Sequence, residues 1–163
     1  TFSGWDFPRR CMEIIERYSF DRKRLIFEVV QGYGEYVQPV SQNIRRLRQN
    51  GIKIALTDNG VTSFMELQSC LPDILKLDKK LIESIGTTEG ESVLRALLQI
   101  CRELDIIALA KGVENDGQEC FLREHSCDIL QGFRFFKPVP EWEARRYLLS
   151  ESGNDELAPS FKK

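Results

Sequence analysis

Residues 89–114 read EGESVLRALLQICRELDIIALAKGVE, and this stretch decides the fold. From residue 89 to residue 104, apolar residues recur every three or four positions, which predicts a helix with one buried face. Residues 106–110 (IIALA) are continuously apolar, which predicts a strand that is buried on both faces. A helix followed at once by such a strand is the repeating unit of α/β proteins with parallel sheets.

The same alternation continues in both directions along the chain. Further strands are predicted at residues 25–30, 52–56, 74–78 and 128–131, and further helices at residues 8–18, 35–50, 62–70, 116–125 and 141–149. We expect one domain over residues 1–150 and a polar tail over residues 151–163. A doubly wound sheet and a barrel both fit this order. The sequence has no G-x-G-x-x-G and no Walker A loop, which weakens the nucleotide-binding Rossmann and P-loop classes.

The composition is that of an ordinary globular protein, with 42% apolar and 29% charged residues. The net charge of -2 gives no basic field for a nucleic-acid polymer or an anionic membrane. No apolar run approaches the roughly 18 residues of a membrane span, so we expect no membrane segment and a cytoplasmic location. The chain does not begin with methionine, which suggests a fragment, a processed chain or an incompletely ordered one.

Several aromatic, basic and cysteine residues are expected to be structural. The run RRLR at 45–48 predicts a solvated helix face. A metal site formed by His125 with its flanking cysteines Cys120 and Cys127 is conceivable, but its spacing matches no zinc pattern. Buried free thiols are favoured for the five cysteines. Packing is favoured for the aromatic residues Trp5, Phe133, Phe135, Phe136 and Trp142.

Polar residues stand at the ends of five successive predicted strands, where parallel α/β proteins carry their chemistry. Glu28 and Lys76 lie inside apolar strands, where an unpaired charge costs several kcal/mol. They either pair with each other as a structural ion pair or belong to a convergent polar site at a barrel mouth. Recurrence on five strands favours the site. The polar residues are Glu28, Thr57, Asp58, Lys76, Asp78, Lys111, Glu114 and Gln131.

The residue types in this set point to metal-assisted phosphoryl chemistry. Carboxylates such as Glu28, Asp58 and Glu114 offer the oxygen ligands that a hard divalent cation prefers. A lysine such as Lys76 can hold a phosphate or position a water molecule. A bound cation would polarise the phosphoryl group and activate the water.

Five segments resemble, in order, successive motifs of the EAL domain, and the resemblance runs from about residue 1 to residue 149. It implies a modified TIM barrel that uses Mg²⁺ or Mn²⁺ to hydrolyse the bacterial second messenger cyclic di-GMP to linear pGpG. The segments are LIFEVVQ (25–31), GIKIALTDNG (51–60), LPDILKLDKKLIESI (71–85), IIALAKGVEN (106–115) and DILQGFRFFKPVPEWE (128–143).

A chain of 163 residues is short for a full barrel of roughly 250 residues. We therefore expect an incomplete barrel made of the five to six C-terminal βα units. The family's E-A-L segment, which supplies part of the nucleotide pocket, would precede Thr1. Open sheet edges predict pairing with a protein partner or a second copy, or completion by another segment.

The resemblance assigns family roles to matching residues. Glu28 and Asp58 fall on metal ligands, and Gln131 falls on the glutamine of the Q-G-Y motif. Lys76 and Asp78 match the lysine and aspartate of the K-I-D motif. Glu114 matches the final glutamate of A-E-G-V-E. We predict catalytic roles for Lys76 and Glu114, metal binding by Glu28 and Asp58, and ligand binding by Asp78, Lys111 and Gln131.

Four residues depart from the family pattern. Thr1, Thr57 and Lys111 stand where the family has a metal-binding asparagine, aspartate and glutamate, and Gln31 replaces a loop-supporting glutamate. Two-metal hydrolysis needs several anionic oxygens. At an effective dielectric of about 20, an ammonium a few ångströms away opposes a dication by several kcal/mol. An ammonium could instead take the place of a missing cation and pair with Glu28 or Asp58.

Three interpretations of function follow. The leading one is a degenerate, non-catalytic EAL module of bacterial cyclic di-GMP signalling that regulates or binds. The second is a weakly active phosphodiesterase that uses one metal ion held by Glu28, Asp58 and Glu114, with Lys76 near the attacking water. The third is a pure protein-interaction module. For Lys111 itself, a plain surface charge is the alternative to a role in the site.

Overall fold

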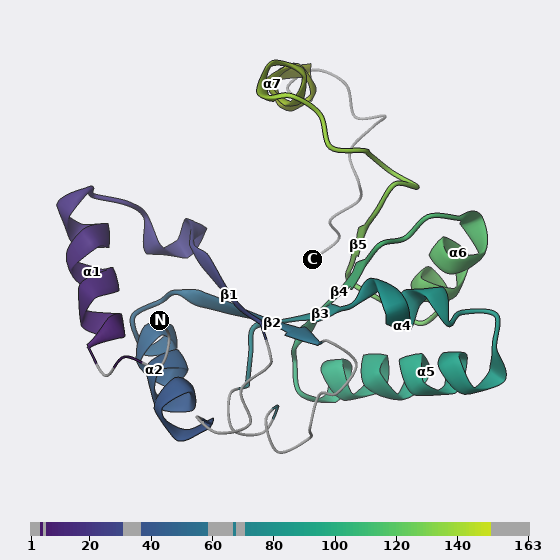
Figure 1. Cartoon of the computed structure of the whole chain (residues 1–163), viewed down its shortest axis with the longest axis horizontal. Helices are drawn as coiled ribbons and strands as arrows, with labels where there is room; N and C mark the ends of the chain where they lie inside the picture. Colours follow the sequence, from purple (N-terminus) through teal and green to yellow (C-terminus); the bar gives the residue numbers. More distant parts are fainter. Residues whose placement is uncertain (1–3, 5, 31–36, 59–66, 68–70, 151–163) are drawn as a thin grey trace.

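The computed structural model describes residues 4, 6–30, 37–58, 67 and 71–150. Its centre is one sheet of five parallel strands in chain order, which confirms the predicted α/β fold (Figure 1). Each predicted strand is present within one or two residues of its expected bounds. The strands are β1 (Ile26–Val30), β2 (Lys53–Asp58), β3 (Ile74–Leu77), β4 (Ile107–Lys111) and β5 (Ile129–Gln131).

Helices connect these strands. The short helix α4 was not predicted, because it has only five residues and follows β3 directly. It starts because the Asp78 carboxylate accepts a hydrogen bond from the Lys80 backbone N–H (3.1 Å). The helix predicted at 62–70 lies outside the described residues apart from Leu67. The helices are α1 (Phe7–Arg17), η1 (Arg22–Arg24, a 3₁₀ helix), α2 (Val37–Gln49), α4 (Lys79–Glu83), α5 (Thr88–Glu103), α6 (Asp116–Glu124) and α7 (Glu141–Ser150).

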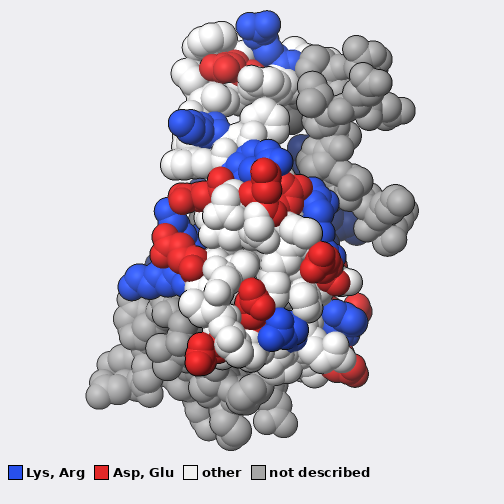
Figure 2. All heavy atoms as spheres, turned by 90° about the vertical axis from the view of Figure 1, so that its right-hand side faces the viewer, with Lys and Arg blue, Asp and Glu red and all other residues white. Residues whose placement is uncertain are grey.

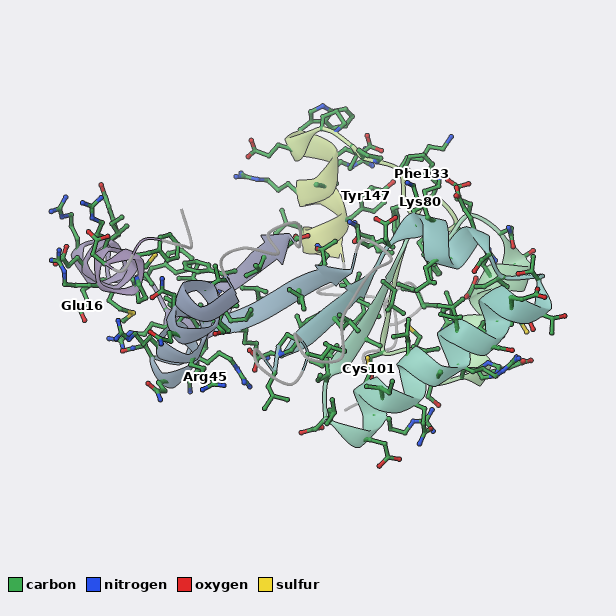
Figure 3. All side chains as sticks on the ribbon, turned by 60° about the horizontal axis from the view of Figure 1, so that its bottom comes forward. Glu16, Arg45, Lys80, Cys101, Phe133 and Tyr147 are labelled. Carbon is green, nitrogen blue, oxygen red and sulfur yellow. The ribbon has the colours of Figure 1, made fainter. Side chains whose placement is uncertain are left out.

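The helices α2 and α5 lie along one side of the sheet and bury their apolar faces against it (Figure 1). A smaller cluster joins α1, α2 and β2 through Ile15, Ile44 and Ile54. The larger cluster packs α5 against β3 and β4, and Cys101 points from α5 into it (Figure 3). This burial fixes the helix-facing side of every strand, so the alternate residues occupy the opposite, inner side of the sheet.

Full burial of the strands holds only at the centre of the sheet. In β2 the residues Ile54, Ala55, Leu56 and Thr57 are all buried. At the edge strand β1, however, Ile26 is 51% exposed. The prediction that residues 106–110 are buried on both faces is only partly right, because in β4 the residues Ala108 and Ala110 are buried whereas Ile107 and Leu109 on the opposite face are half-buried. The open sheet matches the predicted incomplete barrel.

Two surface predictions were wrong. Phe133, Phe136 and Trp142 are 57–62% exposed, because they belong to α7 and the segment before it, which stands away from the sheet (Figure 1). Phe136 still packs against the ring of Tyr147, with 5.3 Å between the ring centroids. Among the aromatic residues expected to pack, Phe135 does contact the larger cluster, and Trp5 lies outside the described residues. The second wrong prediction is that all the cysteines are buried: Cys101 is buried, but Cys120 is exposed.

Other surface features agree with expectation. The arginines of the RRLR run are exposed on α2 whereas Leu47 is fully buried. On the side that carries α5 and α6, acidic and basic side chains are interspersed (Figure 2). Within the described part of the chain, no helix is long and apolar enough to cross a membrane.

Candidate functional site

Glu28, the middle residue of β1, is at the centre of the polar site. Its carboxylate oxygens are both engaged: Oε1 accepts a hydrogen bond from the Thr57 hydroxyl (2.5 Å), and Oε2 accepts one from the Lys76 ammonium (2.6 Å). Thr57 is 3% exposed and Lys76 is 18% exposed at its side chain. The ion pair between Glu28 and Lys76, which was one of two alternatives open from sequence, is therefore present.

Strand register explains this convergence. Thr57 pairs with Val30 on one side and with Lys76 on the other. Glu28, two residues before Val30, lies on the same inner side of the sheet, since side chains alternate along a strand. The adjacent strands β1, β2 and β3 thus bring the acceptor Glu28 and the donors Thr57 and Lys76 together on the inner side of the sheet.

The charges around Glu28 stabilise its ionised form. The hydrogen bond from Lys76, and next the one from Thr57, lower the pKa of the Glu28 carboxyl below its ordinary 4.5. The charge of Lys111 acts in the same direction from β4. Among the described residues, no carboxylate lies within ion-pair distance of Lys111, so it acts on Glu28 through space.

Lys111 is the last residue of β4 and is half-buried. Its register partner is Gln131, the exposed last residue of β5. Lys76 of the neighbouring β3 pairs with Leu109, two residues before Lys111, so both lysines lie on the inner side of the sheet. This register places Lys111 on the same side of the sheet as Lys76 and Glu28.

The described residues do not fit a divalent metal centre. Each oxygen of Glu28 already accepts a hydrogen bond, and one of its donors is an ammonium that repels a cation. The part of the chain that the structure describes contains no cluster of three or more histidine, cysteine, aspartate or glutamate side chains that could hold a metal ion. Asp58 ends β2, and its side chain lies outside the described residues, as do Thr1 and Gln31.

Glu114 pairs with a different lysine from the one that pairs with Glu28. The Lys79 ammonium of α4 donates to Glu114 Oε1 at 2.6 Å, and this hydrogen bond raises the pKa of Lys79. The aliphatic stem of Lys79 lies over Gly112, where a Cβ would stand 2.6 Å from the lysine Cγ. Gly112 has φ +76°, a conformation that glycine adopts at little cost. The β4–α6 loop is thereby fixed to the start of α4.

Two residues of this arrangement were missed from sequence. Lys79 follows the K-I-D motif, but nothing local indicates that it meets Glu114. Gln118 is buried, and its side-chain oxygen accepts the backbone N–H of Glu114 (2.8 Å) and forms a capping box with Asn115. The N-x-x-Q spacing at residues 115–118 could have identified the cap.

Comparison with known proteins identifies the family to which this sequence is similar. A family model of the EAL domain matches residues 1–138. An uncharacterized signaling protein of Caulobacter vibrioides is 33% identical over 138 residues, which are 82% of this chain and 17% of that protein. A probable cyclic di-GMP phosphodiesterase of Escherichia coli, PdeD, is 35% identical over 99 residues, which are 59% of this chain and 19% of that protein. This chain thus spans less than a fifth of the length of either relative.

Solved structures show the same fold. The PaMucR phosphodiesterase in complex with c-di-GMP has a TM-score of 0.78 at 24% identity, and the match covers 88% of this chain and 60% of that one. An EAL domain protein from Listeria monocytogenes has a TM-score of 0.80 at 23% identity, with coverage of 90% and 60%.

The parallel sheet, its flanking helices and the polar strand ends define a TIM-barrel-like α/β protein whose candidate site lies at the C-terminal edge of the sheet. Within that class, this chain belongs to the EAL domain family.

Proposed function

We propose that this chain is a regulatory EAL module of cyclic di-GMP signalling that binds without hydrolysing the nucleotide. The observation that carries the proposal is the state of Glu28, whose two oxygens accept hydrogen bonds from Thr57 and Lys76. Lys111 adds a positive charge where the family has a metal-binding glutamate. A cation would have to displace the Lys76 ammonium and overcome the repulsion of Lys111.

Incubation with cyclic di-GMP and Mn²⁺, followed by chromatography, tests this proposal. We expect the nucleotide to remain intact. The control is Lys76→Ala, which removes a predicted catalytic residue. Formation of pGpG by the wild type above the level of this variant would refute the proposal.

A weak phosphodiesterase that depends on Mg²⁺ or Mn²⁺ is the second candidate. It is favoured by the presence of Glu28, Lys76 and Glu114 at the family's positions. In this case Lys76 would position the attacking water, with Glu114 released from Lys79. Such an enzyme would give pGpG in the same assay, and chelation of the metal would abolish the product.

We further propose that the module acts with a protein partner or a second copy of itself. The edge strands β1 and β5 each have one neighbour in the described sheet, and unpaired strand edges favour association. Phe133, Phe136 and Trp142 add exposed apolar surface. Light scattering coupled to size exclusion should report a dimer at micromolar concentration; a monomer at every concentration would leave only the heterologous partner.

A further inference from the structure

The net charge of -2 conceals an uneven distribution of charge along the chain. Residues 1–53 contain ten arginines and lysines and six aspartates and glutamates, whereas residues 54–163 contain thirteen and nineteen. The helices α1 and α2 belong to the positive part and lie at one end of the molecule, whereas α5 and α6 lie at the other (Figure 1). Glu16 of α1 and Arg45 of α2 mark this end in Figure 3. The charge distribution favours an anionic partner there.

Residues 17–24 (RYSFDRKR) form a corner between α1 and β1 at this end. The corner lies at the N-terminal end of β1, opposite the edge of the sheet that carries the candidate site. Arg22 pairs with Glu16 at 3.4 Å, and the Asp21 carboxylate accepts the backbone N–H of Lys23 at 3.0 Å. Three further cations of the corner are exposed and have no ionic partner among the described residues: Arg17, Lys23 and Arg24.

The same corner exposes large apolar side chains. Tyr18 is 73% exposed and Phe20 is 49% exposed. Ile14, one helical turn before Tyr18 on the same side of α1, is 56% exposed. Single exposed apolar residues are ordinary, but neighbouring ones beside unpaired cations indicate a surface that another molecule covers.

Hydrogen bonds and packing hold the backbone of the corner in place. Ser19 has φ +49°, and the N–H of Phe20 donates to the carbonyl oxygen of Ile15 at 3.0 Å. The 3₁₀ helix η1 follows, and the side chain of Asp21 caps it. Ile15 is buried in the smaller cluster and Leu25 packs against that cluster, so the corner is anchored at both ends. Docking through the corner therefore avoids the cost of ordering a loop.

We propose that this corner docks the module on an anionic lipid surface. Cations beside aromatic and aliphatic side chains are the combination that binds membrane interfaces, because the cations meet lipid phosphates while the apolar groups enter the headgroup region. The aliphatic Ile14 favours lipid over a nucleic acid, since it offers no ring on which a base can stack. In this orientation the candidate site, at the opposite edge of the sheet, stays open to water.

Sedimentation with lipid vesicles tests this docking. The probes are vesicles of phosphatidylcholine alone and vesicles in which about one-third of the lipid is the anionic phosphatidylglycerol. We expect the chain to bind only the anionic vesicles. Binding should weaken about tenfold or more at about 1 M salt, where the Debye length falls to about 3 Å.

Two variants separate the contributions of charge and apolar surface. The triple substitution Arg17→Gln, Lys23→Gln and Arg24→Gln should weaken binding to the anionic vesicles about tenfold or more. Tyr18→Ser plus Phe20→Ser should weaken it severalfold at unchanged charge, a loss that purely electrostatic attraction would not show.

The matched control removes three exposed cations from other parts of the molecule and should change vesicle binding by less than about twofold. It combines Lys80→Gln, Lys137→Gln and Arg146→Gln. Circular dichroism verifies that each variant is folded. If the triple variant of the corner does not fold, its three single substitutions replace it, and each should weaken binding more than the corresponding single substitution of the control.

Any of four results would overturn the docking: no binding of the wild type to the anionic vesicles, equal losses in the corner variant and the control, unchanged binding in the Tyr18 and Phe20 variant, or binding of a DNA duplex in place of vesicles. A duplex that binds the wild type and is lost in the corner variant would assign the corner to a nucleic acid. None of these measurements involves cyclic di-GMP, so the proposed function is tested separately.

Discussion

The Lys76 ammonium lies 2.6 Å from a carboxylate oxygen of Glu28, although their strands β3 and β1 are not neighbours. The strand between them, β2, contributes Thr57, whose hydroxyl donates a hydrogen bond to the other oxygen of the same carboxylate. Glu28 is therefore an acceptor inside a protein-only network. This arrangement accounts for the poor fit of the described residues to a divalent cation.

Restoring two family carboxylates should restore metal affinity. In Thr57→Asp plus Lys111→Glu, one hydrogen-bond donor and one ammonium are replaced by two carboxylates, a change of three charge units at the edge. We expect the affinity for Mn²⁺ to rise at least tenfold, about 1.4 kcal/mol, as measured by calorimetry.

The neutral pair Thr57→Asn plus Lys111→Gln is the matched control, since its side chains have similar size and no negative charge. It should bind Mn²⁺ much more weakly than the acidic pair. Equal affinities of the two double variants would show that the two positions do not reach a common cation.

The ion pair of Glu28 should contribute stability that depends on pH. Because Lys76 and Thr57 lower the pKa of Glu28 from 4.5, the folded state binds its proton less readily than the unfolded state does. The contribution is fully present above pH 4.5 and is lost as the pH falls through the lower pKa of the folded state. Glu28 is 40% exposed at its side chain, so solvent limits the effect to about 1 kcal/mol or less.

Urea denaturation of the wild type and of Glu28→Gln measures this dependence. The difference in free energy of unfolding should be constant from pH 5 to pH 7, above the ordinary pKa of 4.5, and should shrink at lower pH. A difference that grows on acidification would contradict the assigned direction.

Gly132→Ala should destabilise the segment that follows β5. A Cβ at this position would stand 2.1 Å from the carbonyl oxygen and 2.3 Å from the nitrogen of Val113, and backbone atoms of a buried residue cannot move away easily. We expect a loss of about 1–3 kcal/mol in the free energy of unfolding, measured by denaturation in urea.

Gly117→Ala is the control for this substitution. Its Cβ would meet only the side-chain oxygen of Asn115, at 3.4 Å, and the residue lies in α6. Because alanine is the better helix former, this variant should be as stable as the wild type or slightly more stable. Equal losses in both variants would mean that contact with Val113 is not the cause.

The side chain of Asp73 should stabilise the sheet, because its carboxylate accepts a hydrogen bond from a backbone N–H of β2. Its Oδ2 accepts the backbone N–H of Ile54 (2.8 Å), and its carboxylate also pairs with Arg48 (3.1 Å). Asp73→Ala leaves the N–H of Ile54 without this partner, and we expect a loss of about 1–3 kcal/mol in the free energy of unfolding.

Two further variants separate the roles of Asp73. Asp73→Asn keeps an acceptor oxygen, and Arg48→Ala removes only the exposed ion pair, which is worth about 0–1 kcal/mol. Each should cost less than Asp73→Ala. A loss from Arg48→Ala as large as that from Asp73→Ala would assign the effect to the ion pair instead.

The order of strands and helices could be predicted from sequence because it depends on local spacing. The apolar runs at 106–110 and 52–56 and the amphipathic pattern at 89–104 are set by which side chains each segment must bury. The same segments contain the motifs that resemble the family. The exposure of Phe133 and Trp142 could not be predicted, because it depends on how α7 stands relative to the sheet.

The sequence by itself therefore determined the strand–helix order, the family and the residues that gather at the strand ends. Only the tertiary structure decided the partners of the charges. Glu28 and Lys76 are 48 residues apart in the chain, and Lys79 and Glu114 are 35 apart. No local pattern specifies which carboxylate a lysine meets, because the register of β1, β2 and β3 brings Glu28 to Lys76, and the position of α4 beside the β4–α6 loop brings Lys79 to Glu114. That pairing leaves Lys111, the last residue of β4, without an ionic partner among the described residues.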